Sequence, residues 1–150
     1  MQKITPFLWF DKDASKIAEF YASVFKDAKI KSKTVMSDTP SGSVEVVNMD
    51  IFGQEFTLMS AGPIFKFTEA ISFVINCKDQ EEVDYYWNAL SAVPESEQCG
   101  WIKDKYGVSW QIVPAVLNEL LAKDKSGKVT QAMLKMKKII IKDLELAHNQ

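Results

Sequence analysis

One stretch of eleven residues decides the fold, and it reads Asp104-Lys105-Tyr106-Gly107-Val108-Ser109-Trp110-Gln111-Ile112-Val113-Pro114. Gly107 supplies the permissive backbone that a tight hairpin turn needs, and Pro114 is unable to extend a hydrogen-bonded ladder. Successive side chains of a strand point to opposite sides, so this strand has two faces. The core face is predicted to hold Val108, Trp110 and Ile112, and the cavity face Ser109, Gln111 and Val113.

An earlier segment repeats this design, and the repeat predicts an internal duplication. Phe52-Gly53 and the strand 55–60 correspond to the later turn and strand at an offset of 54 residues. An offset of 65 residues places the first strand and helix on a second strand and helix, with Thr5 on Ala70.

The first copy is predicted to contain a strand at 4–10, a helix and three further strands. Asp11 or Asp13 is expected to cap the helix, because acidic and small polar residues accept hydrogen bonds at that position. Apolar residues recur along the helix at a spacing of three and four, which predicts one buried stripe. These residues are Ile17, Phe20, Tyr21, Val24 and Phe25, and the later strands are expected at 29–36, 44–51 and 55–60.

The second copy is predicted to repeat this order with a shorter second strand. It has a strand at 70–77, a helix that starts at Asp79 with Glu82 completing a capping pair, and the segment 97–103 paired with 108–113. We therefore expect one domain over 1–150, made of module 1 (1–61), module 2 (70–114) and a C-terminal helical extension (115–150). The extension shows two apolar helical patterns, separated by Lys125-Ser126-Gly127.

The composition is that of one globular domain with a substantial core. The chain has 150 residues, 47% hydrophobic content and a formal net charge of -2, so no global field attracts nucleic acid or a membrane surface. The residues after Met1 do not resemble a signal peptide, and no segment is long enough to span a bilayer. Cys77 and Cys99 lack metal-type spacing and indicate reduced thiols, hence a cytoplasmic protein.

A strand-helix-three-strand module that occurs twice resembles the vicinal oxygen chelate superfamily, which includes glyoxalase I, extradiol dioxygenases and the bleomycin-resistance proteins. Several segments together resemble its PhnB-like group, often labelled 3-demethylubiquinone-9 3-methyltransferase domain. They are Phe10-Asp11 with Glu19-Phe20-Tyr21, Gly62-Pro63 with the segment 65–73, Gln98-Cys99-Gly100-Trp101, the segment 104–111, and the segment 133–138.

The resemblance implies an α+β fold in which two βαβββ modules form a half-open barrel, often as a homodimer. In the metal-dependent members, the first and fourth strand of each module each supply one ligand, usually His, Gln or Glu. The matching positions are Thr5, Thr57, Ala70 and Gln111, with Met59 or Ser60 in place of Thr57 if that strand slips. Divalent metals prefer imidazole, thiolate or carboxylate ligands, so we expect neither a bound metal nor another cofactor. His148 is the only histidine, and it has no group of other potential ligands beside it to complete a metal site.

The sequence therefore favours metal-independent binding of a small organic molecule in the cavity, with Gln111 as the polar anchor. An apolar, aromatic wall with a few hydrogen-bonding groups is typical of such sites. The alternative is that side chains fill the barrel and leave no cavity. The expected ligand-binding residues are Phe7, Trp9, Met59, Ser72, Ser109 and Gln111, accompanied by Val74 and Val113.

Three other functions remain open. One is a metal-dependent lyase, isomerase or dioxygenase, and another is a module whose function is its dimer interface. The third is the methyltransferase of the family label, which is disfavoured because the sequence has no glycine-rich nucleotide-binding turn.

No catalytic residue is assigned. Cys99 has no histidine placed to deprotonate it, and the candidate carboxylates are typical of surface or turn positions. These carboxylates are Asp50, Glu55 and Asp104.

Overall fold

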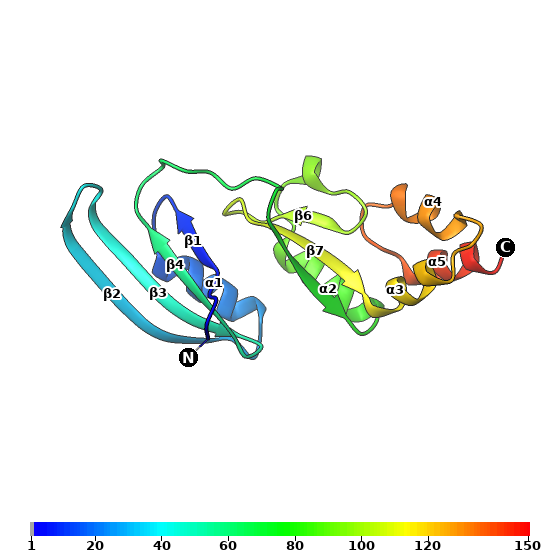
Figure 1. Ribbon diagram of the computed structural model, residues 1–150, viewed down its shortest axis with the longest axis horizontal. Coiled ribbons are helices and arrows are strands. Elements are labelled where there is room, and N and C mark those ends of the chain that lie inside the picture. Colours follow the sequence, from blue (N-terminus) through cyan, green and yellow to red (C-terminus); the bar gives the residue numbers. More distant parts are fainter. Residues whose placement is uncertain (1) are drawn as a thin grey trace. The chain divides into compact units, whose positions relative to one another are not determined.

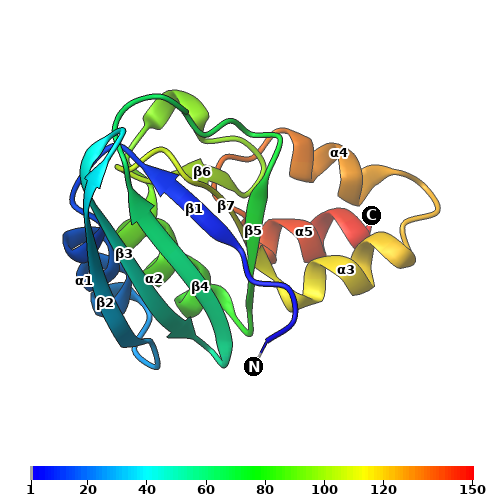
Figure 2. The ribbon, with the colours of Figure 1, turned by 60° about the vertical axis from the view of Figure 1, so that its left-hand side comes forward.

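The computed structural model describes residues 2–150, whose contacts divide the chain into two compact units. The first unit ends at Lys66 and the second begins at Phe67. Each unit has one small open sheet with a helix packed on it, and the second also carries a group of C-terminal helices (Figures 1 and 2). The α+β class predicted from the sequence is confirmed.

The first unit keeps the predicted order of elements. It contains β1 (Phe7–Phe10), α1 (Ala14–Val24), β2 (Lys29–Thr39), β3 (Gly42–Ile51) and β4 (Gln54–Ser60). The spatial order is β1-β4-β3-β2, with β1 parallel to β4 and the other pairs antiparallel (Figure 1). Strand β1 starts later than predicted, because Pro6 lacks the N–H that a ladder needs. Strand β2 forms the edge of the sheet and is exposed along almost its whole length.

Helix α1 packs on β2, β3 and β4 through the predicted apolar stripe. Ile17, Tyr21, Val24 and Phe25 are buried, and Phe20 is half-buried. They meet one face of the sheet, which we call the helix-packed face. Leu8 and Phe10 of β1 and Leu58 of β4 lie on that face and are buried.

The N-terminus of α1 is capped differently from the prediction. Asp13 holds the cap position with a left-handed backbone (φ 63°) but its side chain makes no capping hydrogen bond. The sheet supplies the acceptors instead, since Ala14 N donates to Ser60 Oγ (3.2 Å) and Ser15 donates to the Glu45 carboxylate. The backbone amides of the first turn, which have no partner within the helix, thus donate to side chains that are distant in the sequence. No local sequence pattern could predict these contacts.

The second unit repeats the first with one strand fewer among its described residues. It contains β5 (Ser72–Cys77), α2 (Gln80–Leu90), the 3₁₀ turn η1 (Pro94–Ser96), β6 (Trp101–Lys103) and β7 (Ser109–Pro114). The spatial order is β5-β7-β6, with β5 parallel to β7 and β6 antiparallel to it. The predicted short second strand is absent from the described residues, where η1 precedes a single bridge between Gln98 and Trp101.

The predicted cap of α2 is confirmed. Asp79 Oδ1 accepts a hydrogen bond from Glu82 N (2.9 Å), and Glu81 and Glu82 place negative charge in the first turn. Acidic side chains there interact favourably with the helix dipole. The helix packs on β5, β6 and β7, and its buried stripe comprises Val83, Tyr86, Trp87 and Leu90.

The turn between β6 and β7 is organised by a buried carboxylate. Asp104 is 1% exposed and accepts hydrogen bonds from Tyr106 N (2.9 Å), Val108 N (3.1 Å) and Trp110 Nε1 (2.9 Å). Gly107 turns the chain with φ 90°. The predicted core face of β7 is confirmed, because Val108, Trp110 and Ile112 are all buried.

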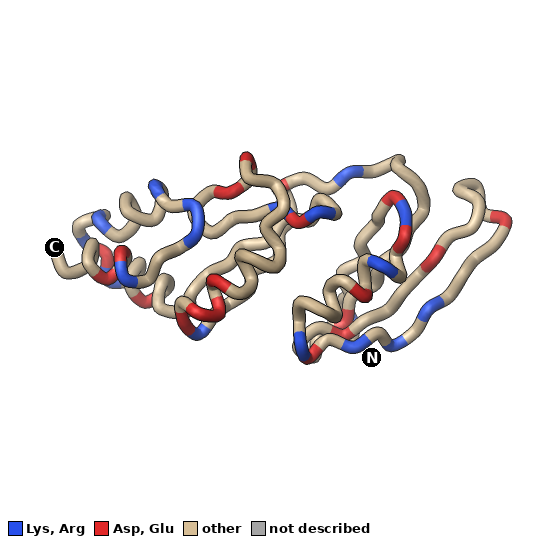
Figure 3. The backbone as a smooth tube through the Cα atoms, turned by 180° about the vertical axis from the view of Figure 1, so that it is seen from behind, with Lys and Arg blue, Asp and Glu red and all other residues tan. Residues whose placement is uncertain are grey.

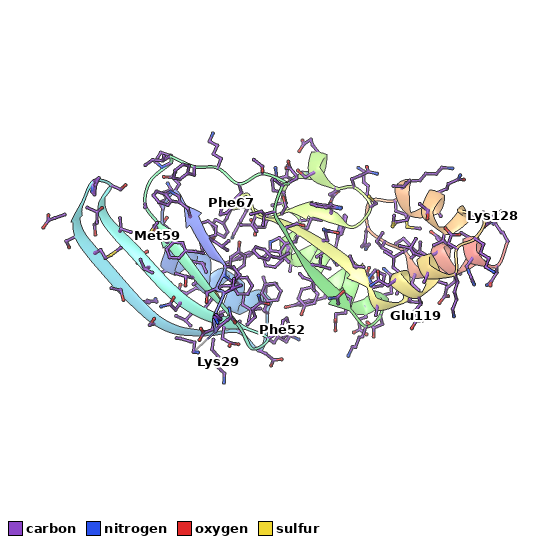
Figure 4. All side chains as sticks on the ribbon, viewed as in Figure 1. Lys29, Phe52, Met59, Phe67, Glu119 and Lys128 are labelled. Carbon is purple, nitrogen blue, oxygen red and sulfur yellow. The ribbon has the colours of Figure 1, made fainter. Side chains whose placement is uncertain are left out.

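The C-terminal helices are α3 (Ala115–Ala122), α4 (Lys128–Leu134) and α5 (Ile141–His148). They share a buried cluster of their own, to which Val113 at the end of β7 adds partial cover. Figure 4 labels Glu119 in α3 and Lys128 at the start of α4. The cluster consists of Leu117, Leu120, Val129, Ile139 and Leu144.

The side chain of Gln80 in α2 ties this extension to the sheet module. Its Nε2 donates to Ile139 O (3.0 Å), and its Oε1 accepts from Ile141 N (2.8 Å). Ile139 lies just before α5 and Ile141 is its first residue, where the helix itself offers the N–H no partner.

Acidic and basic residues are interspersed along both units (Figure 3). Among residues 2–150, no helix combines the length and the apolar character required to cross a bilayer.

Candidate functional site

The first unit places three of the predicted ligand-binding residues on the face opposite α1. In the parallel pair of β1 and β4, Phe7 lies beside Thr57 and Trp9 beside Met59. Phe7 is 57% exposed, while Trp9 and Met59 are half-buried (Met59 is labelled in Figure 4). Trp9 is held in place, since its Nε1 donates to Gly62 O (2.9 Å).

Three polar side chains on this face of the first unit pair with one another. Thr57 Oγ1 donates to Asn48 Oδ1 (2.7 Å), and Asn48 Nδ2 donates to Ser32 Oγ (2.9 Å). The three residues are direct neighbours across β4, β3 and β2 and form a polar ladder. Thr5 lies before β1, 3.5 Å from Gln2 Nε2. The two predicted metal-ligand positions of this unit therefore offer only neutral hydroxyls, one of which is committed to the ladder.

The second unit brings Ser72 and Gln111 together on the face opposite α2. Gln111 Nε2 donates to Ser72 Oγ (2.9 Å), which links β7 to β5. Val74, 48% exposed, is the direct neighbour of Gln111 in the parallel pair. Ala70 lies in the exposed turn before β5. Of the predicted residues of this unit, the structure thus joins Ser72 and Gln111 and leaves Ala70 outside the sheet.

Ser109 lies on the same face as Gln111 and is 2% exposed. Its Oγ is buried and has no hydrogen-bond partner among the described residues. A buried hydroxyl without a partner is costly, because it loses its hydrogen bonds to water. Beside it in the sheet is Lys103, which pairs with the Glu69 carboxylate. The hydrogen bond from Lys103 lowers the pKa of Glu69.

A pocket of about 450 Å³ opens beside Ser109 in the second unit. Of the residues that line the pocket, the sequence predicted only Ser109, although one signal for Trp101 was available. Trp101 is the direct partner of Gln111 across the hairpin, and counting back from the Gly107 turn puts both side chains on one face. The lining residues are Glu69, Glu95, Ser96, Gln98, Cys99, Trp101, Ile102 and Ser109.

The carboxylates considered as acids or bases have structural roles. Asp50 Oδ1 accepts from Gly53 N (2.7 Å) in the turn between β3 and β4. Glu55 forms an exposed ion pair with Lys31 (2.6 Å), whose hydrogen bond and charge lower the pKa of Glu55. Asp104 fixes the later hairpin through backbone and indole donors. None of the three carboxylates lines the pocket beside Ser109.

The two cysteines occupy different environments, and neither is in a disulfide. Cys77 is 1% exposed, and burial raises the pKa of its thiol to about 12. Cys99 is half-buried in the pocket wall and has an unusual backbone for a residue other than glycine (φ 36°).

The donor set does not fit a divalent metal. Two hydroxyls, an alanine and an amide hold the four family positions, whereas such ions are bound by imidazole, thiolate or carboxylate groups. Within residues 2–150, no three His, Cys, Asp or Glu side chains gather closely enough to hold an ion. His148 is exposed in the last turn of α5.

Comparison with known proteins places these features in a family. The model of the family described as 3-demethylubiquinone-9 3-methyltransferase matches residues 2–113. The solved structure of the PhnB protein from Bacillus cereus is 32% identical, with a TM-score of 0.63, and the match covers 76% of this chain and 100% of that chain. No curated protein matches the chain.

More distant structures share the fold. A protein from Pseudomonas aeruginosa is 15% identical over 76% of this chain and 98% of that chain, with a TM-score of 0.56. The fosfomycin resistance protein FosX from Listeria monocytogenes, solved with Mn(II) and 1S,2S-dihydroxypropylphosphonic acid, is 18% identical over 81% and 99% of the two chains, with a TM-score of 0.58. By its sequence and its fold, the chain belongs to the family described as 3-demethylubiquinone-9 3-methyltransferase, the PhnB-like family.

Proposed function

We propose that this protein binds a small organic molecule without a metal ion, on the face of the second unit's sheet opposite α2. Gln111 is the polar anchor of the site. The observation that carries the proposal is the pairing of Gln111 with Ser72 on that face, beside the pocket lined by Ser109.

The hydrogen-bonding capacity of this face supports the proposal. Gln111 uses its Nε2 toward Ser72, which leaves its Oε1 as an acceptor available among residues 2–150. The Ser109 hydroxyl has no partner there either. A ligand with one donor and one acceptor would satisfy both groups, and such a match gives specificity in an otherwise apolar site.

The surroundings of these groups are apolar and aromatic. Trp101 and Val74 are the direct neighbours of Gln111 on its two sides, and both retain exposed surface. A flat ring can rest on an indole or on a branched aliphatic side chain and lose contact with water. We therefore favour a small, partly aromatic molecule that carries an amide-like or hydroxyl group.

The other functions considered for the family receive less support. A metal-dependent lyase, isomerase or dioxygenase needs ligands that the four family positions do not supply. A methyltransferase needs a site for its methyl donor, and the sequence has no glycine-rich strand-to-helix turn to approach a nucleotide-like group.

A thermal-shift experiment tests the anchor. A panel of small aromatic amides such as benzamide is screened, and bound members should raise the melting temperature of the wild-type protein. The shift should be largely lost in Gln111→Ala. Thr57→Ala is the matched control, because Thr57 holds the repeat-equivalent position in the first unit and should leave the shift unchanged. Equal shifts in Gln111→Ala and wild type would refute the anchor.

Two further experiments address the wall and the metal. The sequence also predicts that Trp9 contributes to binding, and Trp9→Ala tests that prediction in the same assay. Elemental analysis of protein prepared without chelator should find less than one equivalent of Zn, Ni, Mn or Fe. A full equivalent that survives dialysis would contradict metal independence.

A homodimer and a cytoplasmic location are part of the proposal. Leu134 and Leu146 in the C-terminal helices are 53% and 54% exposed, and exposed apolar side chains of this size support an interface there. Light scattering should give the mass of a dimer for wild type and a smaller mass for Leu146→Lys. A wild-type mass of one chain would contradict the dimer. Two free cysteines are consistent with the reducing cytoplasm.

A further inference from the structure

We infer that the pocket beside Trp101 selects ligands that carry a positively charged amine, with the ring of the ligand on the Trp101 indole and its ammonium group beside Glu95. The inference deepens the proposed function and rests on it, because Trp101 is the direct cross-strand neighbour of the Gln111 anchor. It names the charge of the ligand, which the family resemblance does not assign.

The charged residues of the pocket wall are acidic. Glu69 and Glu95 are exposed and line the pocket, and none of its described lining residues is a lysine or an arginine. Lys103 pairs with Glu69 and so offsets one of the two negative charges. Glu95 makes no ion pair within residues 2–150. One carboxylate of the wall is therefore available to a cation.

The backbone amides of the turn beside the pocket are already used. Cys99 and Gly100 form this turn with left-handed backbones (φ 36° and 89°). Successive N–H groups in such turns commonly bind an anion. Here, however, Cys99 N donates to Met136 O (2.7 Å) and Gly100 N donates to Lys137 O (2.8 Å). The turn therefore has neither of these two amides to offer to an anionic ligand.

The neutral side chains of the wall also leave acceptors for a ligand. Gln98 uses its Nε2 to donate to Leu134 O (2.8 Å), which leaves its Oε1 as an acceptor among residues 2–150. Ser109 lines the pocket, is 2% exposed, and has a buried Oγ with no partner among the same residues, which points to a ligand. An ammonium group supplies three N–H donors and no acceptor. This balance of groups favours a cation over an anion.

The 3₁₀ turn η1 that carries Glu95 is held by hydrogen bonds on both sides. Ala92 N donates to Lys103 O (3.0 Å), and Ser91 Oγ donates to Glu97 Oε2 (2.7 Å). The Glu97 carboxylate is thus committed to the fold and does not line the pocket. Glu95, two residues earlier, has no such commitment among residues 2–150. The two carboxylates therefore differ in role although they are close in the sequence.

Trp101 gives the pocket a half-buried aromatic surface. The face of an indole attracts a cation placed over it and also packs against a flat ring. Side chains that lie opposite each other across a hairpin are about 5 Å apart, so one benzene ring can extend from the Gln111 amide to Trp101. The pocket volume of about 450 Å³ is typical of a site for a small molecule. The ligand class is therefore a small aromatic amine.

Three benzamides that differ chiefly in charge test the inference on the full chain. At neutral pH, 4-(aminomethyl)benzamide is a cation, 4-(hydroxymethyl)benzamide is neutral and 4-carbamoylbenzoate is an anion. Isothermal titration calorimetry measures their Kd values at low salt. The cation should bind about fivefold more tightly than the neutral probe, the upper end of what an exposed ion pair contributes, and the anion should bind most weakly. These differences should shrink at about 1 M salt, where the Debye length is about 3 Å.

Variants identify the groups that select the cation. Glu95→Gln should reduce the preference for the cation over the neutral probe to about twofold or less. Glu97→Gln is the matched control, because it removes the same charge from a nearby position, keeps an oxygen for the Ser91 hydroxyl, and should behave as wild type. Trp101→Phe keeps a ring but should weaken the binding of the cation, since indole attracts cations more strongly than benzene. Circular dichroism checks that each variant is folded.

The outcomes separate this inference from the proposed function. If the three probes bind with equal Kd, if the cation does not bind at millimolar concentration, or if its preference survives in Glu95→Gln, the inference is overturned even where the amide panel still depends on Gln111. If the cation is preferred through Glu95 while Gln111→Ala leaves its Kd unchanged, the charge selectivity of the pocket stands and the Gln111 anchor fails.

Discussion

The two units share one order of elements but pair the polar side chains of their sheets differently. In the first, four strands extend the sheet, and Thr57, Asn48 and Ser32 satisfy one another across it. In the second, three strands remain among the described residues, and Ser109 on β7 has a buried hydroxyl with no partner there. Ser109 lies between Ser72 and Lys103 in the ladder, but Ser72 pairs with Gln111 and Lys103 pairs with Glu69, so the Ser109 hydroxyl stays available for a ligand. The comparison explains why we place the binding function in the second unit.

The register of the parallel strands also differs between the units. Phe7 lies beside Thr57, and the two repeat offsets equate these residues with Ser72 and Gln111. In the second unit, however, Gln111 lies beside Val74 and Ser72 beside Ser109. The shift is two residues, which leaves every side chain on its original face. Evolution of the repeat could therefore change the neighbours of the anchor without turning the strand over.

The largest expected effect concerns the two repeat-equivalent turn carboxylates, Asp50 and Asp104. Asp104→Ala leaves two backbone amides and the Trp110 indole without their buried acceptor, which should cost about 3 kcal/mol of unfolding free energy. Asp50→Ala removes one bond to Gly53 N at a half-buried site and should cost about 0.5–1 kcal/mol. Urea denaturation measures both. Equal costs would mean that the later hairpin does not depend on its buried carboxylate.

The next largest effect concerns how the C-terminal helices are attached. The first unit has no such helices. Gln80→Ala removes the two hydrogen bonds to Ile139 O and Ile141 N and should lower the unfolding free energy by about 1–2 kcal/mol. Hydrogen exchange should rise first in α5 and in the segment before it. Gln131→Ala on the exposed surface of α4 is the control. Unchanged exchange in α5 would show that the helices are held by their own cluster alone.

A smaller effect distinguishes the N-terminal caps of α2 and α1. The cap of α2 is a near neighbour in the sequence, whereas the caps of α1 are side chains of the sheet. Asp79→Ala removes the acceptor for Glu82 N and should cost about 1 kcal/mol, the usual value for a lost N-cap. Asp13→Ala should cost less, because the Asp13 side chain makes no capping bond. Thermal unfolding of the two variants compares them directly. A larger loss from Asp13→Ala would contradict the assignment.

The smallest effect is the pH dependence that Glu45 gives to the first unit. Hydrogen bonds from the Ser15 hydroxyl and amide lower the pKa of Glu45 in the folded protein. The resulting stability is therefore present above the unfolded pKa and is lost as the pH falls through the folded value. Glu45→Gln should flatten this part of the stability profile between pH 7 and acid. An unaltered profile would assign the dependence to other carboxylates.

Much of the fold follows from local patterns in the sequence. Alternation in the segment 108–113 gave the core face of β7, and Asp79 with Glu82 gave the start of α2, because both signals act between near neighbours. The capping of α1 by Glu45 and Ser60 was beyond prediction, since its partners lie thirty or more residues away. The loss of one strand before β6 was missed because Pro94-Glu95-Ser96 is compatible with either a turn or a strand end.

The candidate site was less accessible to sequence reasoning. The repeat offsets make Ser72 and Gln111 direct neighbours, whereas in the structure Ser72 lies beside Ser109 and its hydrogen bond with Gln111 runs diagonally across the two strands. The partnerless hydroxyl of Ser109 depends on burial, and burial depends on tertiary packing. Trp101 could have been found by counting across the hairpin. Cys99 lines the pocket from the two-residue turn that joins Gln98 to Trp101, where its backbone is left-handed.

The long outer strand β2 has a consequence for how the protein behaves in concentrated solution. Its outer edge in the first unit's sheet exposes Val35 and Met36, and Lys29, Lys31 and Lys33 lie along the other half, with Lys31 paired to Glu55 and Lys33 to Glu19. Like charges on such an edge keep two molecules from joining sheet to sheet. Added salt screens that repulsion, so self-association should increase with ionic strength, and Lys33→Thr should bring its onset to lower salt.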